Sequence, residues 1–153
     1  MSIFYVSCSI SFDFIVTILH YFRNVLNGSS IFICRRVLTQ HLSKFGVCDI
    51  AVDGEEALQA IEMALESESP YDLICLDIMM PELDGHETLT AIRKLESKFS
   101  LMPGEGSHII MTTSLKDSKN VMTAFSNQCK AYLVKPINQQ KIEEALKKTN
   151  LMA

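Results

Sequence analysis

Apolar residues recur at two alternating spacings from residue 29 onward. Intervals of three and four residues place side chains on one helical face, and short continuous apolar runs suit strands that are buried on both faces. The predicted helices cover residues 31–45, 55–66, 86–96, 119–128 and 138–148, and the predicted strands cover residues 48–52, 73–76, 108–112 and 131–134. This alternation predicts a doubly wound α/β domain with a parallel sheet.

A sheet of this kind needs another strand before the first helix, and the sequence leaves its place open. The candidates are Ile3–Ser9, Phe14–Leu19 and the short run Val25-Leu26. We therefore divide the chain into an atypical apolar segment, residues 1–28, which supplies a first strand or an extra helix, and a main domain, residues 29–153. Ser29 and Ser30 are candidate N-caps of the first helix of that domain.

The N-terminal segment resembles no ordinary leader. Between Ser2 and Phe22 the only formal charge is Asp13, and the length approaches that of a membrane-spanning helix. The charge in mid-segment, His20 near its end and many β-branched residues favour a buried strand or helix. A membrane anchor and a poorly ordered segment are the alternatives. A signal peptide would begin with basic residues, which are absent here, so we expect a cytoplasmic protein.

Composition excludes several classes of function. The 153 residues suffice for one domain with a proper core, and the net charge of −4, without a basic stripe, argues against nucleic-acid binding. The five cysteines form no CxxC pair, which is typical of reduced thiols in a cytosolic protein rather than of disulfides or a zinc site.

Three polar residues directly follow predicted strands. They are Asp77, Thr113 and Lys135. Because the carboxyl ends of parallel strands meet at one edge of a sheet, we expect these side chains to converge there. A carboxylate that attacks phosphorus, with a hydroxyl and an ammonium that hold phosphoryl oxygens, suits phosphoryl transfer. Pro81 and the Asp84-Gly85 turn are then expected to form a loop that keeps Asp77 exposed at this edge.

The segments around these residues resemble those of response-regulator receiver domains of two-component systems, of the chemotaxis-regulator type. Residues 72–85 (DLICLDIMMPELDG) are similar to the phosphoacceptor segment of this family. Met111–Ser114 (MTTS) resembles its hydroxyl-bearing strand end, and Ala131–Pro136 (AYLVKP) resembles its lysine-proline segment. The resemblance covers about residues 31–148 and implies a five-stranded parallel sheet of flavodoxin-like order 2-1-3-4-5.

The resemblance also implies roles for individual residues. Asp77 is expected to receive a phosphoryl group from a histidine kinase or phosphotransfer protein in a phosphorelay. Thr113, rather than its neighbour Thr112, is expected to bind that group and couple it to loop movement, and Lys135 is expected to contact one of its oxygens. Tyr132 matches the aromatic switch of the family, the alternative being a half-buried strand tyrosine. The helix near residues 119–128, the strand after it and the last helix would form the output face toward a downstream protein.

The sequence departs from the family at the metal site. Receiver domains usually carry two acidic residues at the end of the first strand, which hold Mg²⁺, and here Ser29 and Ser30 stand in their place. Asp77 and the backbone carbonyl of Met79 remain as ligands, which are too few for a hard cation, and Asp13 is a remote substitute. We therefore expect weak Mg²⁺ binding and slow phosphorylation and dephosphorylation.

Three hypotheses follow. The first is a stand-alone receiver that is phosphorylated on Asp77, because no effector domain follows Ala153; its enzymatic activity would be at most self-phosphorylation from a phosphodonor and slow autodephosphorylation. The second is a pseudo-receiver, an interaction module that is not phosphorylated, which Ser29 and Ser30 favour. The third is a membrane-tethered receiver.

Overall fold

The computed structural model describes residues 16–19, 32–51, 53–80, 83–114 and 128–151. Helices and strands alternate along them in the order β1 (Val16–Leu19), α1 (Phe32–Leu42), β2 (Cys48–Ala51), α2 (Gly54–Glu66), β3 (Leu73–Asp77), α3 (Gly85–Lys98), β4 (His108–Thr113), β5 (Ala131–Val134) and α5 (Gln139–Thr149). The elements predicted in these ranges are thus confirmed, with ends displaced by a few residues. The N-cap candidates Ser29 and Ser30, and the predicted helix 119–128 up to residue 127, lie outside the described residues.

The sheet is parallel at its centre and on one side. β3, β4 and β5 run parallel, and their register places Asp77 opposite Thr112 and Thr113 opposite Val134. On the other side of β3 lies β1, which is antiparallel to it. β2 lies beside β1 but outside the hydrogen-bonded ladder, which joins β1-β3-β4-β5 among the described strands. The order of the strands in space therefore agrees with the expected order 2-1-3-4-5. The prediction of a uniformly parallel sheet is wrong for β1, which is antiparallel to β3.

The connection between β1 and α1 is long enough to permit the antiparallel direction of β1. β1 falls within Phe14–Leu19, one of the three candidate first strands, so the N-terminal segment supplies a strand to the sheet. A parallel β1 would end at the edge from which α1 starts and would need only a short connection. The twelve residues between Leu19 and Phe32 (20–31) reach up to about 40 Å, enough to bring the chain back across the sheet from an antiparallel strand.

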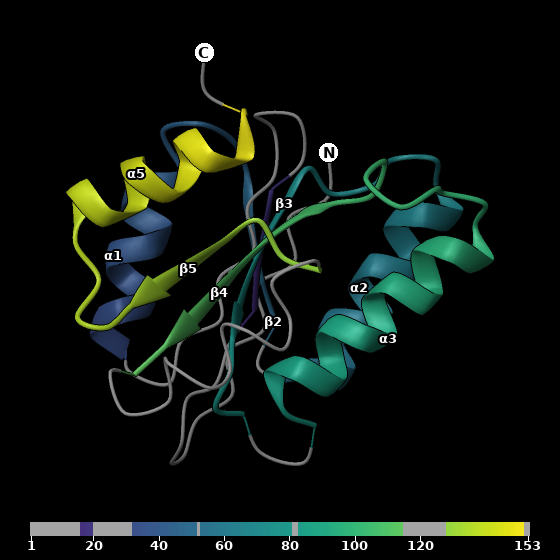
Figure 1. The fold of residues 1–153 in the computed structure, drawn as a ribbon, viewed down its shortest axis with the longest axis horizontal. Coiled ribbons are helices and arrows are strands. Elements are labelled where there is room, and N and C mark those ends of the chain that lie inside the picture. Colours follow the sequence, from purple (N-terminus) through teal and green to yellow (C-terminus); the bar gives the residue numbers. More distant parts are fainter. Residues whose placement is uncertain (1–15, 20–31, 52, 81–82, 115–127, 152–153) are drawn as a thin grey trace.

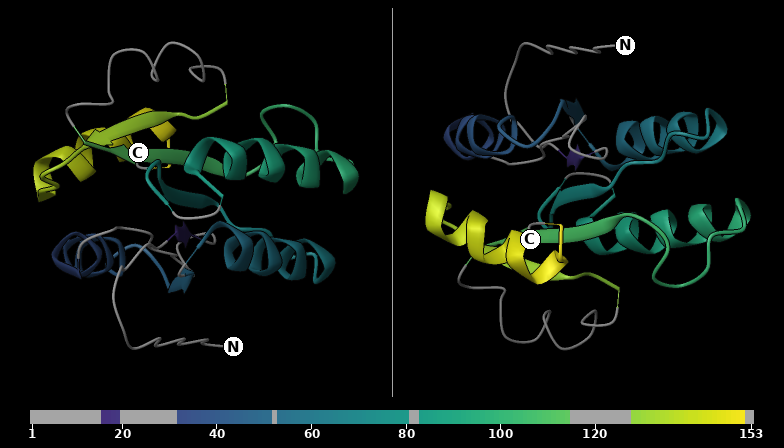
Figure 2. Two further views of the ribbon diagram at one scale, coloured as in Figure 1. Left: turned by 90° about the horizontal axis from the view of Figure 1, so that it is seen from below. Right: turned by 90° about the horizontal axis from the view of Figure 1, so that it is seen from above.

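Helices cover both faces of the sheet. α1 and α5 lie on one face, and α2 and α3 lie on the other (Figures 1 and 2). β3 alternates strictly between the two: Leu73 and Cys75 belong to the apolar cluster under α1 and α5, and Ile74 and Leu76 belong to the cluster under α2 and α3. This arrangement explains why every residue of β3 is buried. In the described part of the chain, no helix is both long and apolar enough to cross a membrane.

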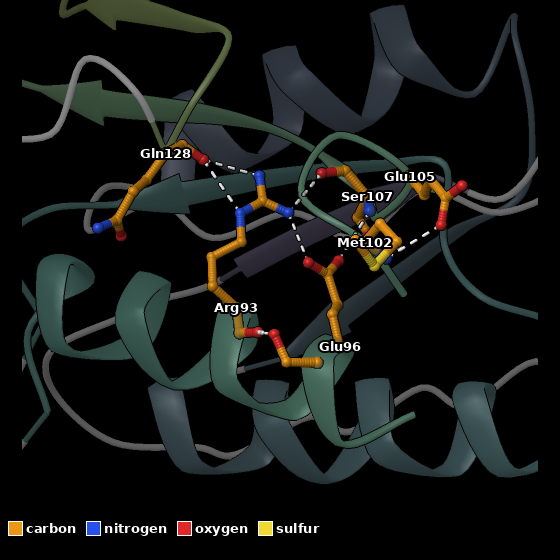
Figure 3. A network of polar contacts seen from close by, with 7 residues as sticks. Arg93, Glu96, Met102, Glu105, Ser107 and Gln128 are labelled. Atoms are coloured by element: carbon orange, nitrogen blue, oxygen red, sulfur yellow. Dashed lines mark hydrogen bonds and ion pairs between the residues drawn. The ribbon is translucent and has the colours of Figure 1, made fainter. Parts of the chain in front are cut away.

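A buried polar network fixes the amino ends of β4 and β5 to α3 (Figure 3). Arg93 donates to the carbonyl of Gln128 from Nε (3.2 Å) and Nη2 (2.7 Å), and to the carbonyl of Ser107 from Nη1 (3.0 Å). The same Nη1 lies 2.6 Å from a carboxylate oxygen of Glu96, which is only 4% exposed. The second oxygen of Glu96 accepts from the Ser107 N–H at 2.7 Å.

Candidate functional site

Asp77 is the last residue of β3 and is fully buried, so the expectation of an exposed side chain is wrong: Met79 and Lys135 both contact the carboxylate. The hydrogen-bonded ladder continues one residue past it, where the N–H of Ile78 donates to the carbonyl of Thr112 at 3.0 Å. Oδ1 of Asp77 accepts from the main-chain N–H of Met79 at 3.2 Å. The carboxylate is therefore held at the carboxyl edge of the sheet by the turn that follows its own strand.

Lys135 brings a positive charge to this carboxylate. Its Nζ lies 2.6 Å from Oδ2 of Asp77, although the two residues are 58 positions apart in the chain. The side chain of Lys135 is 14% exposed and that of Asp77 is 0% exposed. A hydrogen bond between two ionised groups is stronger than a neutral one, and a buried carboxylate without such a partner would be costly. The sequence-based expectation that these two side chains meet at one edge of the sheet agrees with this geometry.

Thr113 ends β4 at the same edge. Its side chain is fully buried, and its Oγ1 donates to the carbonyl of Ser114 at 3.2 Å. Its own carbonyl accepts from the N–H of Lys135 at 2.8 Å, so the ends of β4 and β5 are joined there. The register thus brings Asp77, Thr113 and Lys135 to one edge, with direct side-chain contact between the first and the last.

The start of α3 packs against the backbone of Asp77. Asp84 caps the helix by accepting from the N–H groups of His86 and Glu87, and the carboxylate of Glu87 accepts from the N–H of Asp84. Gly85 donates to the carbonyl of Ile78 at 3.0 Å, and a Cβ on it would lie 2.3 Å from the carbonyl oxygen of Asp77. The sequence indicates a turn at Asp84-Gly85, but it gives no sign of this close approach.

We predict that Gly85→Ala lowers the free energy of unfolding by about 2 kcal/mol, because the added methyl group meets main-chain atoms of Asp77 and Ile78 that cannot rotate away. Helix propensity alone would favour alanine, so the sign of the change separates the two effects. Chemical denaturation followed by circular dichroism measures it. A variant as stable as the original chain, or more stable, would contradict the close approach.

Tyr132 lies inward. It is half-buried, packs against the apolar cluster under α2 and α3, and its hydroxyl is buried. Burial raises the pKa of the Tyr132 hydroxyl above its usual value, and the nearby thiol of Cys129 adds to the rise. Of the expected output face, β5 and α5 are described, whereas residues 119–127 lie outside the described part.

The described donors near Asp77 do not by themselves fit Mg²⁺. Asp13, Ser29 and Ser30 lie outside the described residues. Within the described ranges, no three His, Cys, Asp or Glu side chains gather as a metal-binding group. Both oxygens of Asp77 accept hydrogen bonds, from Met79 and Lys135. One carboxylate and the carbonyl of Met79 are far from the octahedral oxygen set that Mg²⁺ requires.

Comparisons with known proteins identify the fold and family. Residues 30–147 match the model of the response regulator receiver domain. The chemotaxis protein CheY of Bacillus subtilis is 31% identical over 101 residues, 66% of this chain and 76% of that protein. The probable C4-dicarboxylate response regulator DctR of the same bacterium is 31% identical over 102 residues, which are 67% of this chain but only 39% of DctR. The chain therefore spans well under half of the length of that relative.

A solved structure gives the same result. The receiver domain of the histidine kinase CKI1 of Arabidopsis thaliana, complexed with Mg²⁺, superposes with a TM-score of 0.61 at 28% identity, covering 84% of this chain and 98% of that one. The family model covers far more than half of the sequence and includes Asp77, Thr113 and Lys135. This chain belongs to the response regulator receiver domains of two-component signalling.

Proposed function

We propose that the chain accepts a phosphoryl group on Asp77 from a histidine kinase or a phosphotransfer protein. The observation that carries this proposal is the 2.6 Å contact between the Lys135 ammonium and the Asp77 carboxylate at the carboxyl edge of β3, β4 and β5. Residues 29–153 would act as the receiver unit, completed by the strand β1 that the N-terminal segment, residues 1–28, adds to its sheet. As a partner of a cytoplasmic kinase domain, the receiver would act in the cytoplasm.

The proposed step is an in-line displacement at phosphorus. An oxygen of Asp77 forms the new O–P bond while the P–N bond to the donor histidine breaks, and the electron pair of that bond leaves with the imidazole. Lys135 then exchanges its contact with the carboxylate for one with a phosphoryl oxygen, where negative charge accumulates. The hydroxyl of Thr113 turns from the Ser114 carbonyl to a second phosphoryl oxygen.

The signal would leave through β5, α5 and the helix expected near residues 119–128. Thr113 is joined through its carbonyl to Lys135, so a turn of its side chain acts on the ends of both strands. Tyr132 would move between its inward position and an outward one as this edge rearranges. A downstream protein that binds one position of Tyr132 better than the other would read the change.

No step of the proposed transfer uses Mg²⁺. The receiver of CKI1 was solved with this ion, and in the present chain Asp77 and the carbonyl of Met79 are the ligands that the resemblance implies. With Ser29 and Ser30 in place of the acidic pair, we expect the ion to bind weakly and to speed the reaction little. Lys135 and main-chain N–H groups would then carry most of the charge stabilisation.

The alternative is an interaction module with the receiver fold that is not phosphorylated. Ser29 and Ser30 favour it, because serine hydroxyls supply no negative charge for a metal. Asp77 and Lys135 would then form a structural ion pair. The two functions make opposite predictions: a phosphorylated receiver gains a phosphoryl group on Asp77, and an interaction module does not.

We expect acetyl phosphate to add one phosphoryl group to the protein, and we expect this adduct to be absent from Asp77→Asn. Intact-protein mass spectrometry after incubation with and without Mg²⁺ measures it. Asp53→Asn is a matched control, since Asp53 is another aspartate that follows a strand and caps a helix, and asparagine caps as well as aspartate. An adduct in Asp77→Asn, or none in the original chain under either condition, would overturn the proposal and support the interaction module.

A further inference from the structure

The loop that carries Lys135 is held from α5 by a second lysine. The ammonium of Lys141 donates to the carbonyl of Val134 at 2.9 Å and to the carbonyl of Pro136 at 2.8 Å. These two carbonyls flank Lys135 on either side in the chain. A half-buried cation thus binds the backbone on both sides of the site residue.

The position of this lysine runs against helix electrostatics. Asn138 is the N-cap of α5, and its side chain accepts from the N–H of Lys141, which is the third residue of the helix. The helix dipole disfavours a cation in the first turn, and capping boxes place glutamate or glutamine at this position. No acidic residue in the first turn of α5 offsets the charge. The two carbonyls of the loop are therefore the partners that compensate the ammonium there.

The contacts restrain the backbone from which Lys135 reaches Asp77. The N–H of Lys135 is bound by the carbonyl of Thr113, and the flanking carbonyls are bound by Lys141. A lysine side chain has a flexible four-carbon stem, so the place of its ammonium depends on how firmly its backbone is held. Misplacement of a catalytic group by about 1 Å can cost up to about 100-fold in rate.

We propose that Lys141 is a positioning residue that holds Lys135 against Asp77 and thereby couples α5 to the phosphoacceptor edge. As a role in phosphoryl transfer, this inference rests on the proposed function. A protein that binds the first turn of α5 and pairs an acidic group of its own with the Lys141 ammonium would break the bonds to the two loop carbonyls. The backbone of Lys135 would then be less restrained.

The test compares the original full chain with three variants. Lys141→Met removes the donor and keeps the apolar stem, and Lys141→Arg restores donors. Lys148→Met removes the same charge from an exposed position at the far end of α5. The measurements are the maximal rate and KM of phosphorylation by acetyl phosphate, and the NMR signals of the Lys135 side-chain methylenes, assigned from their absence in Lys135→Met.

We expect Lys141→Met to lower the maximal rate by about 10-fold with little change in KM and to shift the Lys135 signals, because the ammonium is misplaced rather than lost. Lys141→Arg should recover most of the rate, and Lys148→Met should match the original chain in both measurements. Shifted Lys135 signals in a chain that is never phosphorylated would refute the proposed function but keep the positioning role. Unchanged rate and unchanged signals in Lys141→Met would refute the positioning role alone.

Discussion

Replacing Lys135 with methionine should lower the maximal rate of phosphorylation on Asp77 by about 100-fold or more. Negative charge builds up on the phosphoryl oxygens during transfer, and Lys135 is the cation that already contacts the attacked carboxylate at 2.6 Å. Removing one such prearranged donor typically costs about 100- to 1,000-fold in rate. Because we expect weak Mg²⁺ binding here, little remains to compensate the loss. The rate of mass gain with acetyl phosphate measures the effect.

Lys130→Met is the matched control for this variant. Lys130 is exposed and directly precedes β5, whereas Lys135 directly follows it, so the two substitutions remove the same charge from opposite ends of one strand. We expect Lys130→Met to react at the original rate. Thermal unfolding of both variants separates lost chemistry from lost folding. A folded Lys135→Met that reacts as fast as the control would show that Lys135 is a structural partner of Asp77 only.

The convergence of Asp77 and Lys135 could be predicted from the sequence because it depends on few choices. Each residue follows a short apolar run, and parallel strands bring their carboxyl ends to one edge whatever the details of packing. A short continuous apolar run predicts a strand well, since a strand of a parallel sheet that is buried on both faces is apolar at nearly every position. The site and the central strands can therefore be predicted from the apolar runs and from the rule that parallel strands end at the same edge of a sheet.

The direction of β1 could not be predicted in this way. Three of its four residues, Val16–Leu19, are apolar, and so short a pattern does not distinguish a parallel strand from an antiparallel one. The length of the connection to α1 limits which directions are possible, and the sequence offered three candidate strands with three different connection lengths. The consequence reaches the site, because β1 presents its first residue at the edge where receiver domains usually carry an acidic pair.

Contacts with main-chain atoms also could not be predicted from the sequence. Gly85 is read from the sequence as a turn residue, yet its lack of a Cβ serves the approach of α3 to the carbonyl of Asp77. Lys141 lies in the predicted helix 138–148, and its pattern gives no sign that it binds two carbonyls of the β5–α5 loop. In both cases the partner is a backbone atom, which has the same chemistry in every residue and so leaves no signature in the sequence.

Arg93→Met should lower the free energy of unfolding by about 3 kcal/mol and the melting temperature by about 10 °C. Arg93 binds three acceptors from different parts of the chain: the carbonyls of Ser107 and Gln128 and the carboxylate of Glu96. Methionine fills much of the same space but leaves the Glu96 charge buried, with the hydrogen bond from the Ser107 N–H that Figure 3 shows. An uncompensated buried charge is the dominant cost.

Two further variants show whether this charge is the cause. In Arg93→Met/Glu96→Gln the buried group is neutral and still accepts from the Ser107 N–H, so we expect the double variant to be more stable than Arg93→Met. Lys98→Met breaks another ion pair of α3, with Glu62, whose side chain is 40% exposed, and should cost less than about 1 kcal/mol. If Arg93→Met and Lys98→Met cost the same, the network in Figure 3 contributes no more than an exposed pair does, and solvent must reach the carboxylate of Glu96.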